Sequence, residues 1–192
     1  MTSTHTVSLQ DVEAQTTEWL ENVVIGLNLC PFAAKPQRNK QIKIEVCEGN
    51  TDEAVMETLL TELNLLESSD VADLETTLLV TPNYFQDFDD YNQFLDVADM
   101  IIEQFGWRGI YQIASFHPDY CFADAEPDDE SNLTNRSPYP VFHLIREASI
   151  EKALKYYGGD ADAIPDINID RVCSLSNDEK KALFPYLFRT HG

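Results

Sequence analysis

Glycine and positive charge are both scarce in this chain of 192 residues, and each shortage excludes functions. Seven glycines are too few to favour the glycine-rich loops that cradle phosphates in nucleotide-binding proteins. Lys and Arg number 13 against 34 Asp and Glu, which gives a formal net charge of −21. Such a charge repels phosphate backbones and anionic lipid headgroups, so we expect neither nucleic acid nor a membrane surface as a partner.

Long apolar runs and paired cysteines are also missing. The longest apolar run, Val23 to Leu27, falls far short of the roughly 20 residues that a membrane span needs. Residues 1–10 are polar and lack the apolar core of a signal peptide. No two of the four cysteines form a CxxC pair, so free thiols in a reducing cytoplasm are expected.

Motifs for cofactors and metals are absent as well. The chain contains no P-loop, GxGxxG, HExxH or GxSxG sequence. His117 and His143 with Asp119 form only a loosely spaced set, and the acidic runs 124–130 and 166–170 lack the glycine of a calcium loop. We interpret both runs as solvated loops and expect no metal and no cofactor.

Hydrophobic periodicity predicts one α/β domain over residues 1–192. Hydrophobic residues make up 43% of the chain, enough for a core, and apolar positions spaced by three and four indicate a helix from Ser8 to the stop at Pro31. Alternation and β-branched runs predict strands. The remaining elements are strand 41–47, a helix beginning at the Asn50–Glu53 capping sequence, strand 76–80, a helix from Asp87 to Gly106, strands 109–116 and 140–146, helix 149–157 and a helix beginning at Ser176.

This order predicts a small mixed sheet packed with helices. Two β-α-β units with short connections favour parallel strand pairs and right-handed crossovers. The fourth strand follows the third without a helix, so we expect it to run antiparallel.

Charge is unevenly distributed along the chain. Residues 44–107 contain 16 acidic residues and no Lys or Arg, whereas residues 22–44 contain four cations and no carboxylate. We interpret the excess acid as an aid to solubility. The alternative is that the acidic segment docks a basic protein partner.

The connection from Phe116 to Pro140 is the strongest candidate for a functional site, because long ordered loops are often functional. If the strands on either side are neighbours, His117 lies near the same sheet edge as Arg136. The guanidinium, with groups of Asn135 and Ser137, would then bind an anion, and the imidazole would transfer a proton. The alternative is structural: Arg136 ties down acidic groups of the loop, and His117 caps a turn.

Three further residues are candidates. Cys30 is a possible nucleophile, since nearby cations lower a thiol pKa, although a helix C-terminus acts in the opposite direction and buried cysteines are common in cores. His143 is a catalytic candidate that shares a strand face with apolar residues, which favours a core histidine. Arg146 either binds the ligand or pairs with Glu147.

Three segments together resemble a bacterial family known as domain of unknown function 1415. They are Val24-Ile-Gly-Leu-Asn-Leu-Cys-Pro-Phe-Ala33, Tyr111-Gln-Ile-Ala-Ser-Phe-His-Pro-Asp-Tyr120 with Phe122, and Asn132-Leu-Thr-Asn-Arg-Ser-Pro-Tyr-Pro140 running into His143-Leu-Ile-Arg-Glu147. The resemblance implies a small bacterial cytosolic protein and supplies no catalytic residues.

Three functions remain open. The first is an enzyme, a transferase or hydrolase, that acts on a small phosphate- or carboxylate-bearing metabolite through the His and Arg residues. The second is a ligand-binding or sensor protein that uses the same pocket without catalysis. The third is an acidic module that docks a basic protein.

Overall fold

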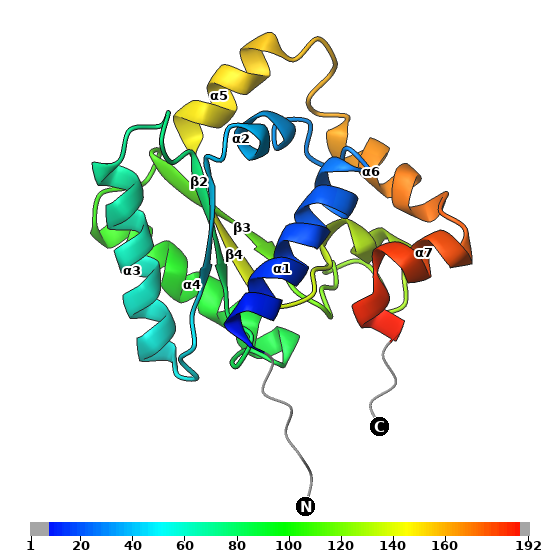
Figure 1. Cartoon of the computed structure of the whole chain (residues 1–192), viewed down its shortest axis with the longest axis horizontal. Coiled ribbons are helices and arrows are strands. Elements are labelled where there is room, and N and C mark those ends of the chain that lie inside the picture. The colour runs from blue at the N-terminus through cyan, green and yellow to red at the C-terminus, as the bar shows by residue number, and fades with distance from the viewer. Residues whose placement is uncertain (1–7, 189–192) are drawn as a thin grey trace, which may run out of the picture.

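The computed structural model describes residues 8–188, so most of the polar start at residues 1–10 lies outside the described range. One compact α/β domain contains every described element (Figure 1). The elements are α1 Leu9–Trp19, η1 Leu20–Ile25, α2 Ala34–Arg38, β1 Ile42–Val46, α3 Asp52–Ser68, β2 Thr76–Val80, α4 Phe88–Gln104, β3 Tyr111–Phe116, η2 Glu130–Asn135, β4 Val141–Arg146, α5 Glu147–Tyr156, α6 Ile164–Cys173, α7 Asn177–Leu183 and η3 Pro185–Phe188.

Side-chain caps begin three helices where the sequence predicts them and a fourth one residue later, whereas α5 begins at Glu147, two residues before the predicted start, without a side-chain cap. Ser8 accepts a hydrogen bond at the start of α1, Asp87 does so for α4, and Ser176 forms a full capping box at α7. The cap of α3 is Thr51, not Asn50, because the Thr51 hydroxyl accepts the amide of Ala54.

The first helix changes form before it ends. After α1 the chain continues as the π-helix η1, where the amide of Gly26 donates to the carbonyl of Glu21 at 2.9 Å. A Cβ at Gly26 would lie 2.2 Å from the carbonyl oxygen of Asn22, so a side chain there would collide with the backbone. The wider turn ends the helix early and places Asn28 in the left-handed region, at φ 53°.

The four strands form one mixed sheet in the order β1-β2-β4-β3. β1 and β2 pair in parallel with α3 between them in the chain, as predicted for the first β-α-β unit. β2 and β3 do not pair, because β4 lies between them and runs antiparallel to both. The fold class is confirmed, whereas direct pairing of the second unit's strands is wrong because β4 fills the gap between them.

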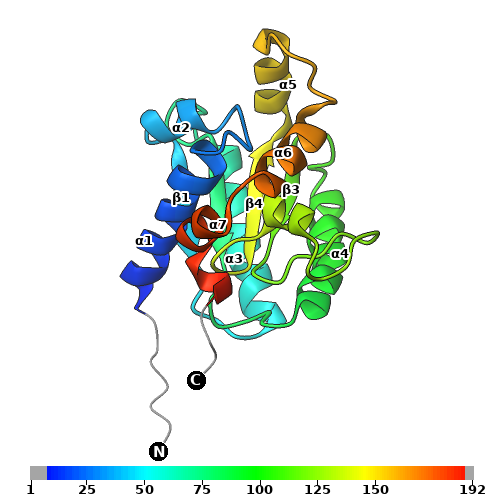
Figure 2. The ribbon, with the colours of Figure 1, turned by 90° about the vertical axis from the view of Figure 1, so that its right-hand side faces the viewer.

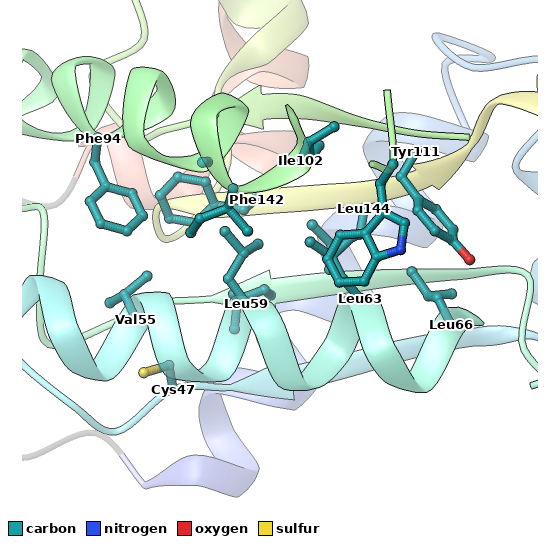
Figure 3. Packing of buried hydrophobic residues seen from close by; sticks show 14 of the residues in the cluster. Cys47, Val55, Leu59, Leu63, Leu66, Phe94, Ile102, Tyr111, Phe142 and Leu144 are labelled. Carbon is teal, nitrogen blue, oxygen red and sulfur yellow. The ribbon is translucent and has the colours of Figure 1, made fainter. Parts of the chain in front are cut away.

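Each face of the sheet has its own core. α3 and α4 cover one face, which we call the α3 face, and Figure 3 shows their side chains meeting Phe142 and Leu144 of β4. α1, α6 and α7 cover the other, which we call the α1 face (Figure 2). Strand alternation assigns each residue to a face, so Val141 and His143 belong to the α1 face.

Two segments outside the predicted helices are helical, and one of them is an acidic run that we interpreted as a loop. Residues 34–38 form α2, and the acidic run 166–170 lies inside α6, which begins with Pro165 in its first turn. α6 is held by its side chains: Asn168 donates to the carbonyl of Leu29 at 2.7 Å, and Arg171 donates to the carbonyl of Leu27. The alternating acidic residues of α6 resemble a loop in the sequence, and its apolar face contributes one buried residue, Val172.

Candidate functional site

His117 follows β3 and is 1% exposed. Its ring centre lies 5.2 Å from that of Tyr91 and 5.3 Å from that of Phe88. Ring Nε2 lies 2.8 Å from the carbonyl oxygen of Phe85, and Nδ1 accepts the amide of Asp119 at 2.9 Å. A carbonyl only accepts, so Nε2 carries the ring proton and Nδ1 the lone pair. Both ring nitrogens are therefore engaged by backbone groups.

The surroundings keep His117 neutral. Burial lowers its pKa; the hydrogen bond to Phe85 and the charges of Asp119 and Asp87 offset this in part, and the charge of Arg136 lowers the pKa further. The bond from the Asp119 amide is the contact expected of a turn cap. Proton transfer by His117 stays a prediction, and in this geometry it requires one of the two ring bonds to break.

Arg136 is half-buried between the two ends of the long loop. Its Nε donates to the carbonyl of Tyr120 at 3.3 Å, and its Nη2 donates to the carbonyl of Pro127 at 2.6 Å. No carboxylate of residues 8–188 lies within ion-pairing distance of the guanidinium. The side chain thus ties the loop through neutral groups and leaves Nη1 unbonded by the described protein.

The two polar neighbours of Arg136 are occupied within the loop. The amide nitrogen of Asn135 donates to the carbonyl of Ser115 at 3.2 Å, while its side-chain oxygen accepts the hydroxyl of Thr134 at 3.0 Å. The buried hydroxyl of Ser137 donates to the carbonyl of Tyr139 at 2.5 Å. A ligand role for Asn135 and Ser137 stays a prediction. A ligand would have to compete with these internal hydrogen bonds.

The fold brings His117 and Arg136 together. The backbone amide of His117 donates to the carbonyl of Asn135 at 3.2 Å, which places His117 beside the residue before Arg136. The guanidinium is close enough to lower the pKa of His117. Around the Arg136 carbonyl, the indole of Trp19 and the hydroxyl of Tyr186 both donate, at 3.0 and 3.1 Å.

His143 lies in the middle of β4, on the α1 face. Its Nε2 lies 2.8 Å from the hydroxyl oxygen of Thr76, and the centre of its ring lies 6.3 Å from that of Phe116. Burial lowers the pKa of His143 to about 4, so the ring is neutral at neutral pH. Its position among apolar residues agrees with the core interpretation, but within residues 8–188 only one of its nitrogens has a partner.

Cys30 lies in the turn that leads into α2. Burial raises the pKa of its thiol, while hydrogen bonds from the backbone of Phe32 and Ala33 lower it, and the net change is upward. The turn is fixed on one side by the bond from Asn168 to Leu29. A thiol with a raised pKa is a weaker nucleophile at neutral pH, and the catalytic role of Cys30 stays a prediction.

Arg146 ends β4 on the α3 face, away from Arg136. Its Nη2 donates to three carbonyls at the end of α3 and the following loop, and Nη1 lies 3.4 Å from the hydroxyl of Tyr111. Five residue steps of β4, about 17 Å, separate Arg146 from Val141, which pairs with Phe116 next to His117. The two arginines therefore do not converge on one ligand, and Arg146 caps α3. The three carbonyls belong to Leu66, Ser69 and Leu74.

Sequence reasoning missed Asn168 and Arg171, which fix the turn before Cys30, and Gln112, which faces the same side of the sheet as His143. The strand alternation was a usable signal for Gln112. No local signal links α6 to the turn at Leu29, because that contact spans 139 residues.

Other expected features are placed as follows. The acidic residues of 44–107 lie mainly on the exposed surfaces of α3, α4 and their loops, and a docked protein partner stays a prediction. Within residues 8–188 no three His, Cys, Asp or Glu side chains lie close enough to hold a metal ion. Among the helices of that range, none has the length and apolarity to cross a membrane.

These features define a mixed α/β domain whose long β3–β4 connection is folded around a buried imidazole and an unpaired guanidinium. The family model described as a protein of unknown function, DUF1415, matches residues 11–182, and the chain belongs to this family. No curated protein and no solved structure matches the chain.

Proposed function

We propose that the protein binds a small molecule bearing a phosphate or carboxylate group, with Arg136 as its main contact. The observation that carries this proposal is a guanidinium held in place by two carbonyls, without a carboxylate, in a chain of charge −21. An arginine fixed in this way has already lost side-chain freedom, so it presents its remaining N–H groups to an anion at low entropic cost.

Three other cations of the described chain are neutralised, whereas Arg146 and Arg171, like Arg136, bond to backbone carbonyls and form no ion pair within residues 8–188. Lys43 pairs with Glu62 and Glu45, Arg108 with Glu103, and Lys180 with Glu130. Arg136 reaches the acidic run 124–130 of its own loop and yet bonds there to the carbonyl of Pro127. Its guanidinium matches the two oxygens of a carboxylate or phosphate, which a lysine does not.

Two versions of this function differ in whether the ligand is consumed. In the first the protein is a transferase or hydrolase, with His117 as acid or base and Cys30 as nucleophile. In the second it is a binding or sensor protein. The two backbone bonds of His117 favour the second version, because they leave neither ring nitrogen open to a substrate. The setting that we propose is a bacterial cytoplasm, which the four free thiols support.

The test is a thermal-shift screen of the purified protein against inorganic phosphate, phosphorylated metabolites and carboxylates. A ligand at about 100 times its dissociation constant adds roughly 2.7 kcal/mol of stability, which is an easily measured shift. Arg136→Gln removes the charge but keeps an amide donor for the loop carbonyls. Lys181→Gln is the matched control, since Lys181 is an exposed cation on α7.

The proposal predicts a ligand that stabilises the wild type and Lys181→Gln equally and has at least a tenfold weaker effect on Arg136→Gln. If no anion stabilises the wild type, or if both variants respond alike, the proposal is wrong. With a ligand in hand, NMR of the mixture over hours separates the versions: product formation that His117→Asn abolishes establishes the enzyme, and an unchanged ligand establishes the binding protein.

A further inference from the structure

The tautomer of His143 follows from its neighbour. The hydroxyl of Thr76 donates its single proton to the carbonyl of Leu144 and also lies 2.8 Å from Nε2 of His143. Since the hydroxyl proton is already used, Nε2 must donate to the hydroxyl oxygen. His143 therefore carries its proton on Nε2, and Nδ1 holds a lone pair.

That lone pair has no partner within the described protein. No residue of 8–188 bonds to Nδ1 of His143. His143 is half-buried rather than fully covered. His143 thus offers a fixed acceptor on the α1 face of the sheet.

A second polar group lies diagonally across from His143. β3 and β4 pair Ala114 with His143 and Gln112 with Ile145, so Gln112 and His143 share a face two positions apart. Such diagonal neighbours have Cα atoms about 7–8 Å apart, within reach of one small planar group. Gln112 is exposed and its amide has no hydrogen bond to the described protein. Ala114, between them, is small and only half-buried.

The chemistry of this pair selects a neutral ligand. Nδ1 only accepts, and a carboxylate or phosphate oxygen facing its lone pair would be repelled. The amide of Gln112 both donates and accepts. The floor between them, formed by Ala114 and Ile145, is apolar. No charged group shifts the pKa of His143, whose lowering comes from burial alone.

We propose that His143 and Gln112 form a binding subsite for a neutral molecule bearing a carboxamide, whose N–H donates to Nδ1 while its carbonyl accepts from the Gln112 amide. The carboxamide lies over Ala114, and the rest of the molecule covers the apolar strand residues beside it. This subsite is separate from Arg136 and does not depend on an anionic ligand binding there.

The test compares benzamide with benzoate, which share a ring but differ in donor and charge. The full-length protein is labelled with 15N-histidine, and the Nδ1 resonance of His143 is followed by NMR as each probe is added. Benzamide should shift this resonance in a saturable way, and benzoate should not. The resonances of His117 report any general effect of the probes.

Two variants decide the outcome. Gln112→Leu changes an exposed residue and should weaken benzamide binding at least fivefold, whereas Gln93→Leu, a change of the same type at an exposed position of α4, should leave it unchanged. Arg136→Gln should also bind benzamide normally, which separates this subsite from the anion site. The proposal is overturned if benzamide leaves the Nδ1 resonance of His143 unmoved, if benzoate shifts it equally, or if Gln112→Leu binds like the wild type.

Discussion

His117 and His143 are both neutral imidazoles within the domain, and they differ in what their second nitrogen meets. In each, burial lowers the pKa, and in each, Nε2 carries the proton. The Nδ1 of His117 accepts the amide of Asp119, while that of His143 has no partner in the described protein. Burial sets the protonation state, and local bonding decides whether the ring is available to a ligand.

The backbone around each ring explains the difference. His117 lies in a turn, where amides and carbonyls are free of the strand ladder and can turn toward a side chain. His143 lies within β4, where the neighbouring backbone groups bond to β2 and β3. The partner that the fold supplies there is a side chain, the hydroxyl of Thr76.

The largest expected effect comes from removing the ring with two bonds. His117→Ala leaves the carbonyl of Phe85 and the amide of Asp119 without hydrogen-bond partners and creates a cavity. We therefore expect a loss of roughly 4 kcal/mol in the free energy of unfolding. Phe85 is held at φ 56°, which is unusual for a bulky residue, and the lost bond helps fix it there. Urea unfolding measures the loss.

A conservative change at the same position provides the control. In His117→Asn the side-chain oxygen takes the place of Nδ1 and keeps the amide of Asp119 paired, so the loss should be about half as large. If His117→Ala costs less than about 1 kcal/mol, the two backbone bonds do not hold the loop.

The second effect is a pH dependence of stability that belongs to His143. Its pKa is about 4 in the folded protein against 6.5 for the free group, so the unfolded chain takes up a proton first as the pH falls. The stabilisation is complete above pH 6.5 and is lost between 6.5 and about 4, by an amount on the order of 3 kcal/mol. Urea unfolding at several pH values, on the wild type and on His143→Phe, measures it.

The variant His143→Phe separates the contributions of His143 and His117 to the pH dependence of stability. His143→Phe should flatten the stability curve between pH 6.5 and 4, and the slope that remains contains the contribution of His117, whose pKa is also lowered. Identical slopes in the two proteins would show that His143 is not held neutral by burial.

The sequence predicts the α/β class because its signals are local. The capping residues Ser8 and Asp87 and the β-branched strand 76–80 depend on near neighbours, and each is found where expected. The position of β4 at the centre of the sheet depends on which strand fills the gap beside β2, and no local pattern encodes that choice.

The sequence predicts which residues of the candidate site lie close together, but not which groups they bond to. The long loop identifies His117 and Arg136 as neighbours because it joins two adjacent strands. The partner of each nitrogen could not be predicted, because Phe85 and Pro127 contribute backbone carbonyls, and every residue type has one. The same holds for Arg146, whose carbonyl partners on and after α3 leave no mark in the sequence.

The smallest expected effect on stability comes from removing the hydroxyl that fixes the tautomer of His143. Thr76→Val keeps the shape of the side chain but removes the hydroxyl that accepts from Nε2, at a cost of about 1 kcal/mol in unfolding free energy. The proton then favours Nδ1, where water can accept it, so 15N NMR should show the opposite tautomer at His143 and no change at His117. A ring that keeps its proton on Nε2 without Thr76 would show that something other than this hydroxyl fixes the tautomer.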